Sequence, residues 1–187
     1  MSSSDRLIAL LATRSARRGD FTLASGKRSS FYIDARLTTM SPEGLSLIGP
    51  AALSVFRQRE WDADSVGGLT LGADPVSYAI SYASAGAAKP IRAFTVRKEA
   101  KGHGTGKLIE GPFDAADRVV VIEDVITTGG SALRAIEAIR AAGATILGVL
   151  AVVDREEGGR QAIEATGVAV ASLARVSEIL PLVPAPA

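Results

Sequence analysis

The chain has no cysteine, and this absence excludes several classes of protein. Without thiols it cannot be a disulfide-stabilised scaffold, and it cannot hold a metal through thiolates. Aromatic residues are also scarce, at 5%, so the apolar content of 47% comes mainly from Ala, Val, Ile and Leu. The composition is that of an ordinary globular protein, and the lack of cysteine is compatible with the reducing cytoplasm.

The sequence also lacks a strong net charge and a long hydrophobic run. With 21 basic and 20 acidic residues the formal charge is +1, so bulk electrostatics does not favour a nucleic-acid partner. No apolar run reaches the roughly 20 residues needed to cross a bilayer. Segment 1–20 lacks the apolar core and cleavage pattern of a signal peptide. We therefore expect one cytoplasmic domain, 1–187, without nucleic-acid or membrane partners.

Hydrophobic periodicity predicts alternating strands and helices. Strands are predicted over 21–23, 30–34, 65–68, 91–96, 119–123, 145–153 and 168–173, and helices over 4–17, 41–58, 75–84, 131–142 and 175–180. Several of these strands are apolar throughout rather than alternating, which is typical of a parallel α/β sheet covered on both faces. Ligands of such sheets bind at the carboxyl ends of the strands.

The most informative motif follows strand 119–123. Two adjacent acids, Glu123 and Asp124, are followed by a turn rich in hydroxyls and glycine, at 127–131, and then by a helix. The free N–H groups of such a turn can surround a phosphate, whereas the acids suit ribose hydroxyls and a developing positive charge. The motif is neither GxxxxGK[ST] nor GxGxxG. It predicts a site for a phosphorylated ribose.

A second distinctive segment is the loop 97–111. It places Arg97, Lys98, Lys101, His103 and Lys107 among glycines, and His103 is the only histidine of the chain. Glycines permit large backbone changes, so a mobile cationic flap over a leaving anion is one interpretation. A solvated basic loop is the other.

Three separated motifs resemble those of the orotate phosphoribosyltransferases, within the type I phosphoribosyltransferase family. Along the chain the motifs are FTLASGKRSSFYID, RKEAKGHGTGKLIEG and VVVIEDVITTGGSA, which is also their order in the family. The resemblance implies an α/β fold with a mostly parallel central sheet flanked by helices. It also implies a small N-terminal, base-binding hood (1–40) and a flexible catalytic loop (97–111).

The same resemblance implies a reaction and a set of site residues. Orotate and phosphoribosyl pyrophosphate (PRPP) would give orotidine 5′-monophosphate and pyrophosphate. Glu123 and Asp124 would hold the ribose and stabilise oxocarbenium charge, and Lys101 and His103 would be catalytic flap residues. The other substrate-binding residues would be Arg97 and Lys98 for the pyrophosphate, Thr127, Thr128, Gly129, Gly130 and Ser131 for the 5′-phosphate, and Tyr32 and Arg155 for the base. Val125, Ile126 and Lys27 would also contact the substrates, without a more specific role.

The resemblance further implies Mg²⁺, held mainly by the substrate, and a homodimer whose flap reaches the partner's site. Gly72 and Ala24 stand where many relatives carry lysine. Each assignment has a plain structural alternative: a salt bridge to Asp154 or Glu156 for Arg155, and a surface charge for Lys27. Two other functions stay open, a phosphoribosyltransferase for another nucleobase and a non-catalytic nucleotide sensor.

Overall fold

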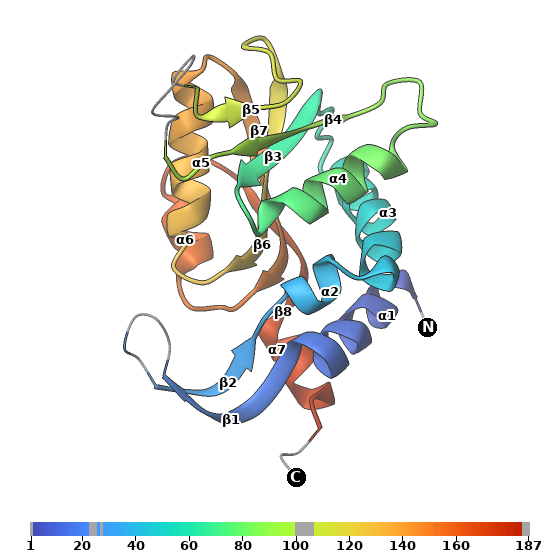
Figure 1. The fold of residues 1–187 in the computed structure, drawn as a ribbon, viewed down its shortest axis with the longest axis vertical. Helices are drawn as coiled ribbons and strands as arrows, with labels where there is room; N and C mark the ends of the chain where they lie inside the picture. Colours follow the sequence, from blue (N-terminus) through green and yellow to red (C-terminus); the bar gives the residue numbers. More distant parts are fainter. Residues whose placement is uncertain (1, 23–25, 27, 100–106, 185–187) are drawn as a thin grey trace.

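A six-stranded sheet forms the centre of the molecule (Figure 1). The structure is a computed structural model that describes residues 2–22, 26, 28–99 and 107–184. The strand order is β5-β4-β3-β6-β7-β8. All neighbouring pairs are parallel except β4 with β5, which is antiparallel. The strands are β3 (Ser65–Leu69), β4 (Arg92–Val96), β5 (Ile109–Glu110), β6 (Arg118–Ile126), β7 (Thr145–Asp154) and β8 (Val170–Arg175).

Helices cover both faces of this sheet, which confirms the predicted architecture. They are α3 (Pro42–Gln58) and α4 (Ala73–Ala83) on one face, and α5 (Gly130–Ala141) and α6 (Gly159–Glu164) on the other (Figure 1). Ser41 caps the start of α3, since its Oγ accepts a hydrogen bond from Gly44 N at 3.0 Å.

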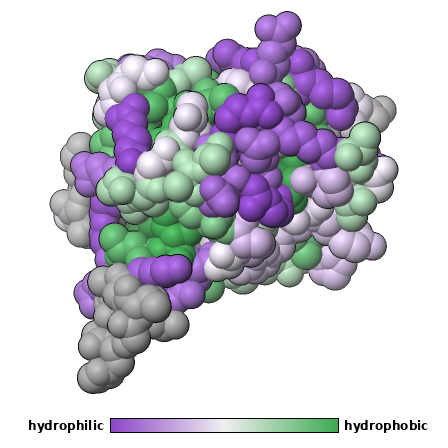
Figure 2. All heavy atoms as spheres, turned by 90° about the horizontal axis from the view of Figure 1, so that it is seen from above, coloured by the Kyte–Doolittle hydropathy of each residue, from purple (hydrophilic) through white to green (hydrophobic). Residues whose placement is uncertain are grey.

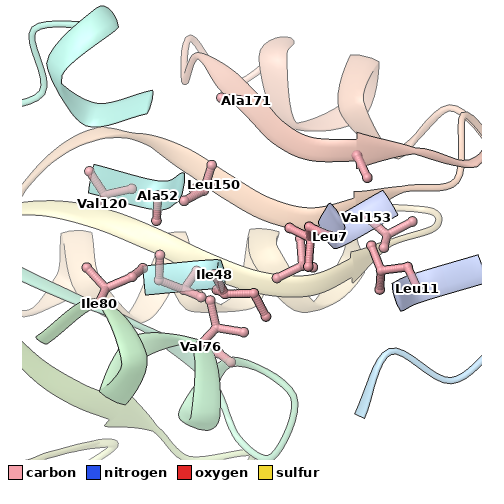
Figure 3. Close-up of a cluster of buried hydrophobic side chains, with 14 of the residues drawn as sticks. Leu7, Leu11, Ile48, Ala52, Val76, Ile80, Val120, Leu150, Val153 and Ala171 are labelled. Carbon is pink, nitrogen blue, oxygen red and sulfur yellow. The ribbon is translucent and has the colours of Figure 1, made fainter. Parts of the chain in front are cut away.

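The side chains of β6 alternate between two apolar clusters. Val120 and Ile122 belong to the cluster under α3 and α4, whereas Val119 and Val121 belong to the one under α5. Figure 3 shows the first cluster, in which residues of α1 (Ser3–Leu10) and η1 (Leu11–Ser15) join those of α3, α4 and β7. Because both faces of the strand are buried, its sequence lacks the polar alternation of a half-exposed strand.

A separate hood lies beyond the carboxyl ends of the strands (Figure 1). The hood contains the antiparallel pair β1 (Ala16–Thr22) and β2 (Arg28–Ile33), together with the short helix α2 (Arg36–Thr39). The C-terminal elements α7 (Val176–Ile179) and η2 (Leu180–Leu182) lie on the same side.

Several predicted boundaries were wrong. The helix predicted over 4–17 ends earlier, because residues from Ala16 onward pair with β2 and the apolar helical spacing does not continue. Strand β6 does not end at the acids but continues to Ile126, since its pairing with β7 continues to that residue. Helices α2 and α6 and strand β5 were not predicted, because they are too short to show a periodicity.

Ionic side chains join the strands at the opposite, amino-terminal end of the sheet. Asp64 accepts hydrogen bonds from the backbone and the guanidinium of Arg118, at 2.8 and 3.1 Å, and Lys89 lies 2.6 Å from it. These hydrogen bonds, first those of Lys89 and then those of Arg118, hold the pKa of Asp64 well below its usual range. Figure 2, which views the molecule from above, shows many hydrophilic residues on this face. None of the helices in the described ranges could span a membrane.

Asp117 is the buried member of this end, and we expect its loss to destabilise the fold. Its carboxylate accepts hydrogen bonds from Ser65 Oγ at 2.8 Å, from Asp114 N at 3.1 Å, and from Arg92. Asp117→Ala leaves these donors unpaired and should lower the free energy of unfolding by about 2–4 kcal/mol, measured by urea denaturation. Asp62→Ala, an exposed acid nearby, should have a much smaller effect. Equal effects of the two variants would contradict this interpretation.

Candidate active site

A cavity of about 310 Å³ lies between the carboxyl ends of the strands and the hood. Its lining includes most parts of the predicted site: the acid pair, the turn that follows it, the hood and the end of β7. The lining residues are Tyr32, Ile33, Asp34, Ala35, Arg36, Leu69, Thr70, Leu71, Gly72, Lys98, Glu123, Asp124, Val125, Thr127, Ser131 and Arg155. Two hollows of about 640 Å³ each contain none of the predicted site residues, and a hollow of about 440 Å³ on the hood contains only Tyr32 among them.

The two acids at the end of β6 differ in their surroundings. Glu123 is 7% exposed, and burial, together with the neighbouring Asp124, raises the pKa of Glu123 to about 9. Asp124 is partly exposed in the cavity, and its Oδ1 accepts a hydrogen bond from Val125 N at 2.8 Å. Burial therefore favours the protonated form of Glu123, and Asp124 is the acid whose side chain is partly exposed to a ligand in the cavity.

The turn between β3 and α4 approaches Asp124 closely. A Cβ added to Gly72 would lie 2.5 Å from Asp124 Oδ1, so a side chain at position 72 would displace this carboxylate. Asp74 fixes the turn by accepting hydrogen bonds from Thr70 Oγ1 at 2.7 Å and from Thr95 Oγ1 at 2.9 Å. The close approach gives a physical reason for glycine at 72, where the resemblance leads one to expect lysine.

The turn after β6 is shaped to receive an anion. Gly129 adopts φ +85° before α5, and no side chain caps this helix, so its first N–H groups point out of the helix end. Gly159 N donates to Thr127 O at 3.0 Å and ties the turn to α6. The side chains of Thr127 and Ser131 line the cavity, whereas Ile126 is buried in the core.

Arg155 follows β7 and lies in the cavity wall at 5% exposure. Its guanidinium lies over the ring of Phe31, 4.9 Å from the centroid. Nη2 is 2.7 Å from Glu157 Oε1, but this ion pair lacks hydrogen-bond geometry, and neither Nε nor Nη2 has a hydrogen-bond partner among the described residues. The alternative pairing with Asp154 is not observed, because Asp154 binds Arg160 at 2.8 Å.

Two charged hood residues in the lining, Asp34 and Arg36, were not singled out from the sequence. Asp34 accepts hydrogen bonds from Arg36 Nε at 2.8 Å and from Arg36 Nη2 at 3.0 Å. These hydrogen bonds lower the pKa of Asp34 and raise that of Arg36. The signal in the sequence was an acid and a base two positions apart, directly after the strand that carries Tyr32.

Only part of the predicted flap can be placed. Lys98 is exposed and lines the cavity, whereas Arg97 lies outside the lining, with Nη1 3.7 Å from Glu110 Oε1. Lys101, His103 and Lys27 lie outside the described residues, as does Ala24. The roles assigned to Lys101, His103 and Lys27 stay predictions.

Three features define a type I phosphoribosyltransferase: the mostly parallel sheet, the hood, and an acid pair followed by the anion-receiving turn 127–131, called here the phosphate-type turn. An adenine phosphoribosyltransferase from Leishmania tarentolae shares the fold at a TM-score of 0.65 and 17% identity, covering 97% of this chain and 93% of its own. No family model matches the chain. Relatives with higher sequence identity show which family within this class the chain belongs to.

These relatives are named orotate phosphoribosyltransferase. The one from Aquifex aeolicus is 48% identical and covers 96% of this chain and 99% of its own. A crystal structure of the Mycobacterium tuberculosis enzyme is 40% identical with a TM-score of 0.84, covering 95% and 99%. A second structure of that enzyme, in complex with PRPP, has a TM-score of 0.75 at 35% identity, covering 95% and 91%. The chain belongs to the orotate phosphoribosyltransferase family.

The raised pKa of Glu123 predicts a pH-dependent stability. Below pH 4.5 both folded and unfolded chains hold this proton, and between 4.5 and about 9 only the folded chain does. Glu123 therefore lowers stability progressively as the pH rises through this window. Glu123→Gln should remove this loss and be more stable than the wild type, by on the order of 5 kcal/mol at pH 8, which lies about 3.5 pH units above the unfolded value of 4.5.

Urea denaturation of both proteins at intervals from pH 5 to 9 measures this difference. Glu137→Gln, at an exposed position of α5, is the matched control and should follow the wild type. Parallel stability curves for Glu123→Gln and the wild type would show that Glu123 is ionised in the folded chain.

Proposed function

We propose that this protein transfers the phosphoribosyl group of PRPP to orotate, giving orotidine 5′-monophosphate and pyrophosphate, a step of pyrimidine biosynthesis. The enzyme is then a pentosyltransferase within the glycosyltransferases. One observation carries the proposal: a buried guanidinium with unused donors, Arg155, lines the same cavity as Asp124 and the phosphate-type turn. Orotate has the carboxylate that such a guanidinium binds, whereas uracil, hypoxanthine and adenine have none.

The geometry supports a definite placement of the substrates. The 5′-phosphate would accept hydrogen bonds from the first N–H groups of α5 and from the hydroxyls of Thr127 and Ser131. The ribose hydroxyls would face Glu123 and Asp124. The base would lie along the hood strand at Tyr32, with its carboxylate at Arg155.

In this arrangement the acids stabilise positive charge at the sugar. When the bond between C1 and the pyrophosphate oxygen breaks, the ribose becomes oxocarbenium-like, and the carboxylate of Asp124 is held in place by Val125 N and the Gly72 turn. Protonated Glu123 can donate a hydrogen bond without adding a second charge. The flap residues Lys101 and His103 would cover the leaving pyrophosphate and exclude water, and no covalent enzyme intermediate is needed.

A divalent cation, Mg²⁺, is proposed to accompany PRPP. The described residues contain no cluster of three or more His, Cys, Asp or Glu that could hold a metal. Mg²⁺ keeps several waters and is commonly bound by one or two carboxylates plus substrate phosphates, so the donor set at Asp124 fits this ion. When bound, the ion would neutralise charge on the pyrophosphate oxygens.

We further propose a cytoplasmic homodimer of the single domain 1–187, with active sites shared between subunits. An exposed apolar face on α3 and α4 supports the dimer, with Pro42, Leu45, Pro50, Tyr78 and Tyr82 around a hollow of about 640 Å³. Tyr78 is 55% and Tyr82 86% exposed, which is unusual for a free monomer surface. Since α4 begins at the turn against Asp124, a second copy on this face would lie beside the cavity.

Arg155→Ala should impair orotate use specifically. Loss of a charge-assisted contact of about 1.5–3 kcal/mol raises the KM for orotate roughly 10- to 100-fold, while the KM for PRPP changes little. Pyrophosphate release with each of orotate, uracil, hypoxanthine and adenine measures both quantities. Arg140→Ala, an exposed arginine on α5, is the control. A wild type that prefers another base, or an unchanged KM for orotate in a folded variant, would contradict the assignment.

The proposed dimer interface can be tested at Tyr82, on the exposed apolar face of α3 and α4. Tyr82→Glu places a charge on the apolar face and should convert the dimer to monomers in sedimentation, with loss of activity if the sites are shared. Leu182→Glu introduces the same charge at another exposed apolar residue and should stay dimeric and active. A monomeric wild type, or a dimeric Tyr82→Glu variant, would refute this interface.

A further inference from the structure

We propose that Arg36 of the hood binds the pyrophosphate group of PRPP and of the product. The inference deepens the proposed function and rests on it. Arg36 is the first residue of α2 and lines the cavity, and its side chain is 48% exposed. It was not among the residues assigned from the sequence.

The guanidinium is held in a defined orientation before any ligand binds. Asp34 accepts hydrogen bonds from three nitrogens of Arg36: Nε at 2.8 Å, Nη2 at 3.0 Å and the backbone N at 3.1 Å. Asp34 is itself anchored, because its backbone N donates to Ser15 O at 2.9 Å. Beneath it, the hydroxyls of Ser15 and Thr38 are 2.7 Å apart in the core. A fixed guanidinium loses little conformational entropy when it binds an anion.

This orientation leaves donors free for a ligand. Among the described residues, none accepts a hydrogen bond from Arg36 Nη1, whereas Asp34 occupies Nε and one side of Nη2. Arg36 is half exposed and also interacts electrostatically with Asp124 and Tyr32, and all three residues line the same cavity. Nη1 is thus available to an anion that binds in this cavity.

The three anionic groups of the two substrates can be assigned by elimination. The 5′-phosphate has the amino-terminal end of α5, and the orotate carboxylate has Arg155, which packs on Phe31. The pyrophosphate remains, and it must leave from C1 near Asp124. Arg36 and the turn at Gly72 line the cavity there, and Figure 1 shows α2 beside the start of α4. The turn cannot carry a cationic side chain at position 72 without moving Asp124, so Arg36 of the hood can supply a cation there in addition to Lys98 and the other proposed flap contacts.

The test uses both directions of the reaction. Arg36→Ala should raise the KM for PRPP, and the KM for inorganic pyrophosphate in the reverse reaction, each roughly 10- to 100-fold. The KM values for orotate and orotidine 5′-monophosphate should change less than about twofold. Arg36→Lys keeps the positive charge but lacks the paired planar donors of the guanidinium, and it should recover part of the loss. Arg14→Ala is the matched control, because Arg14 is also exposed and paired, with Glu43 at 2.5 Å, but does not line the cavity.

The outcomes separate this inference from the proposed function. A wild type that does not convert orotidine 5′-monophosphate and pyrophosphate refutes the function itself. An active wild type with unchanged KM values for PRPP and pyrophosphate in Arg36→Ala refutes only the role of Arg36. Equal increases for all four substrates, together with a lower Tm, would mean that Arg36 merely supports the hood, and this result also overturns the proposal.

Discussion

The site depends on the pairing of β6 with β7 beyond the apolar part of both strands. This parallel ladder continues to Ile126 opposite Asp154, and Arg155 N then donates to Ile126 O at 3.0 Å. The acid pair is thereby held in extended backbone, and the phosphate-type turn starts at the level where Arg155 leaves the sheet. Sugar, phosphate and base contacts of the proposed reaction thus have their spacing set by backbone hydrogen bonds.

Protonation explains how two adjacent acids are tolerated at this end of β6, where Glu123 is buried. A buried pair of carboxylates cannot both ionise without a cation, and burial together with Asp124 keeps the proton on Glu123. Two cations that line the cavity have other carboxylate partners: Arg155 lies at Glu157, and Arg36 is bound by Asp34 while it also interacts electrostatically with Asp124. The side chain of Asp124 is therefore the one available to a developing cation at the sugar.

Much of the candidate site could be predicted from the sequence, and the residues that were missed have physical reasons in common. The acid pair, the hydroxyl and glycine turn and Arg155 were found because their chemistry is local to one segment or marked by the resemblance. Arg36 was missed because its importance comes from a wall built by distant segments, and a four-residue helix has no periodicity. The position of Gly72 against Asp124 is likewise a tertiary contact between two loops, which spacing along the chain does not reveal.

The width of the cavity is set by apolar packing at the base of the hood. Leu7 and Leu11, fully buried, lie beside Val153 in the cluster of Figure 3, so the segment that enters the hood is attached to the strand that ends at Arg155. Close-packed side chains of this kind resist displacement, whereas polar contacts across the cavity would compete with the substrate for the same donors. Because the core holds the two walls together, no contact across the cavity among the described residues uses Arg155 Nε and Nη2 or Arg36 Nη1, and both proposed roles require these donors.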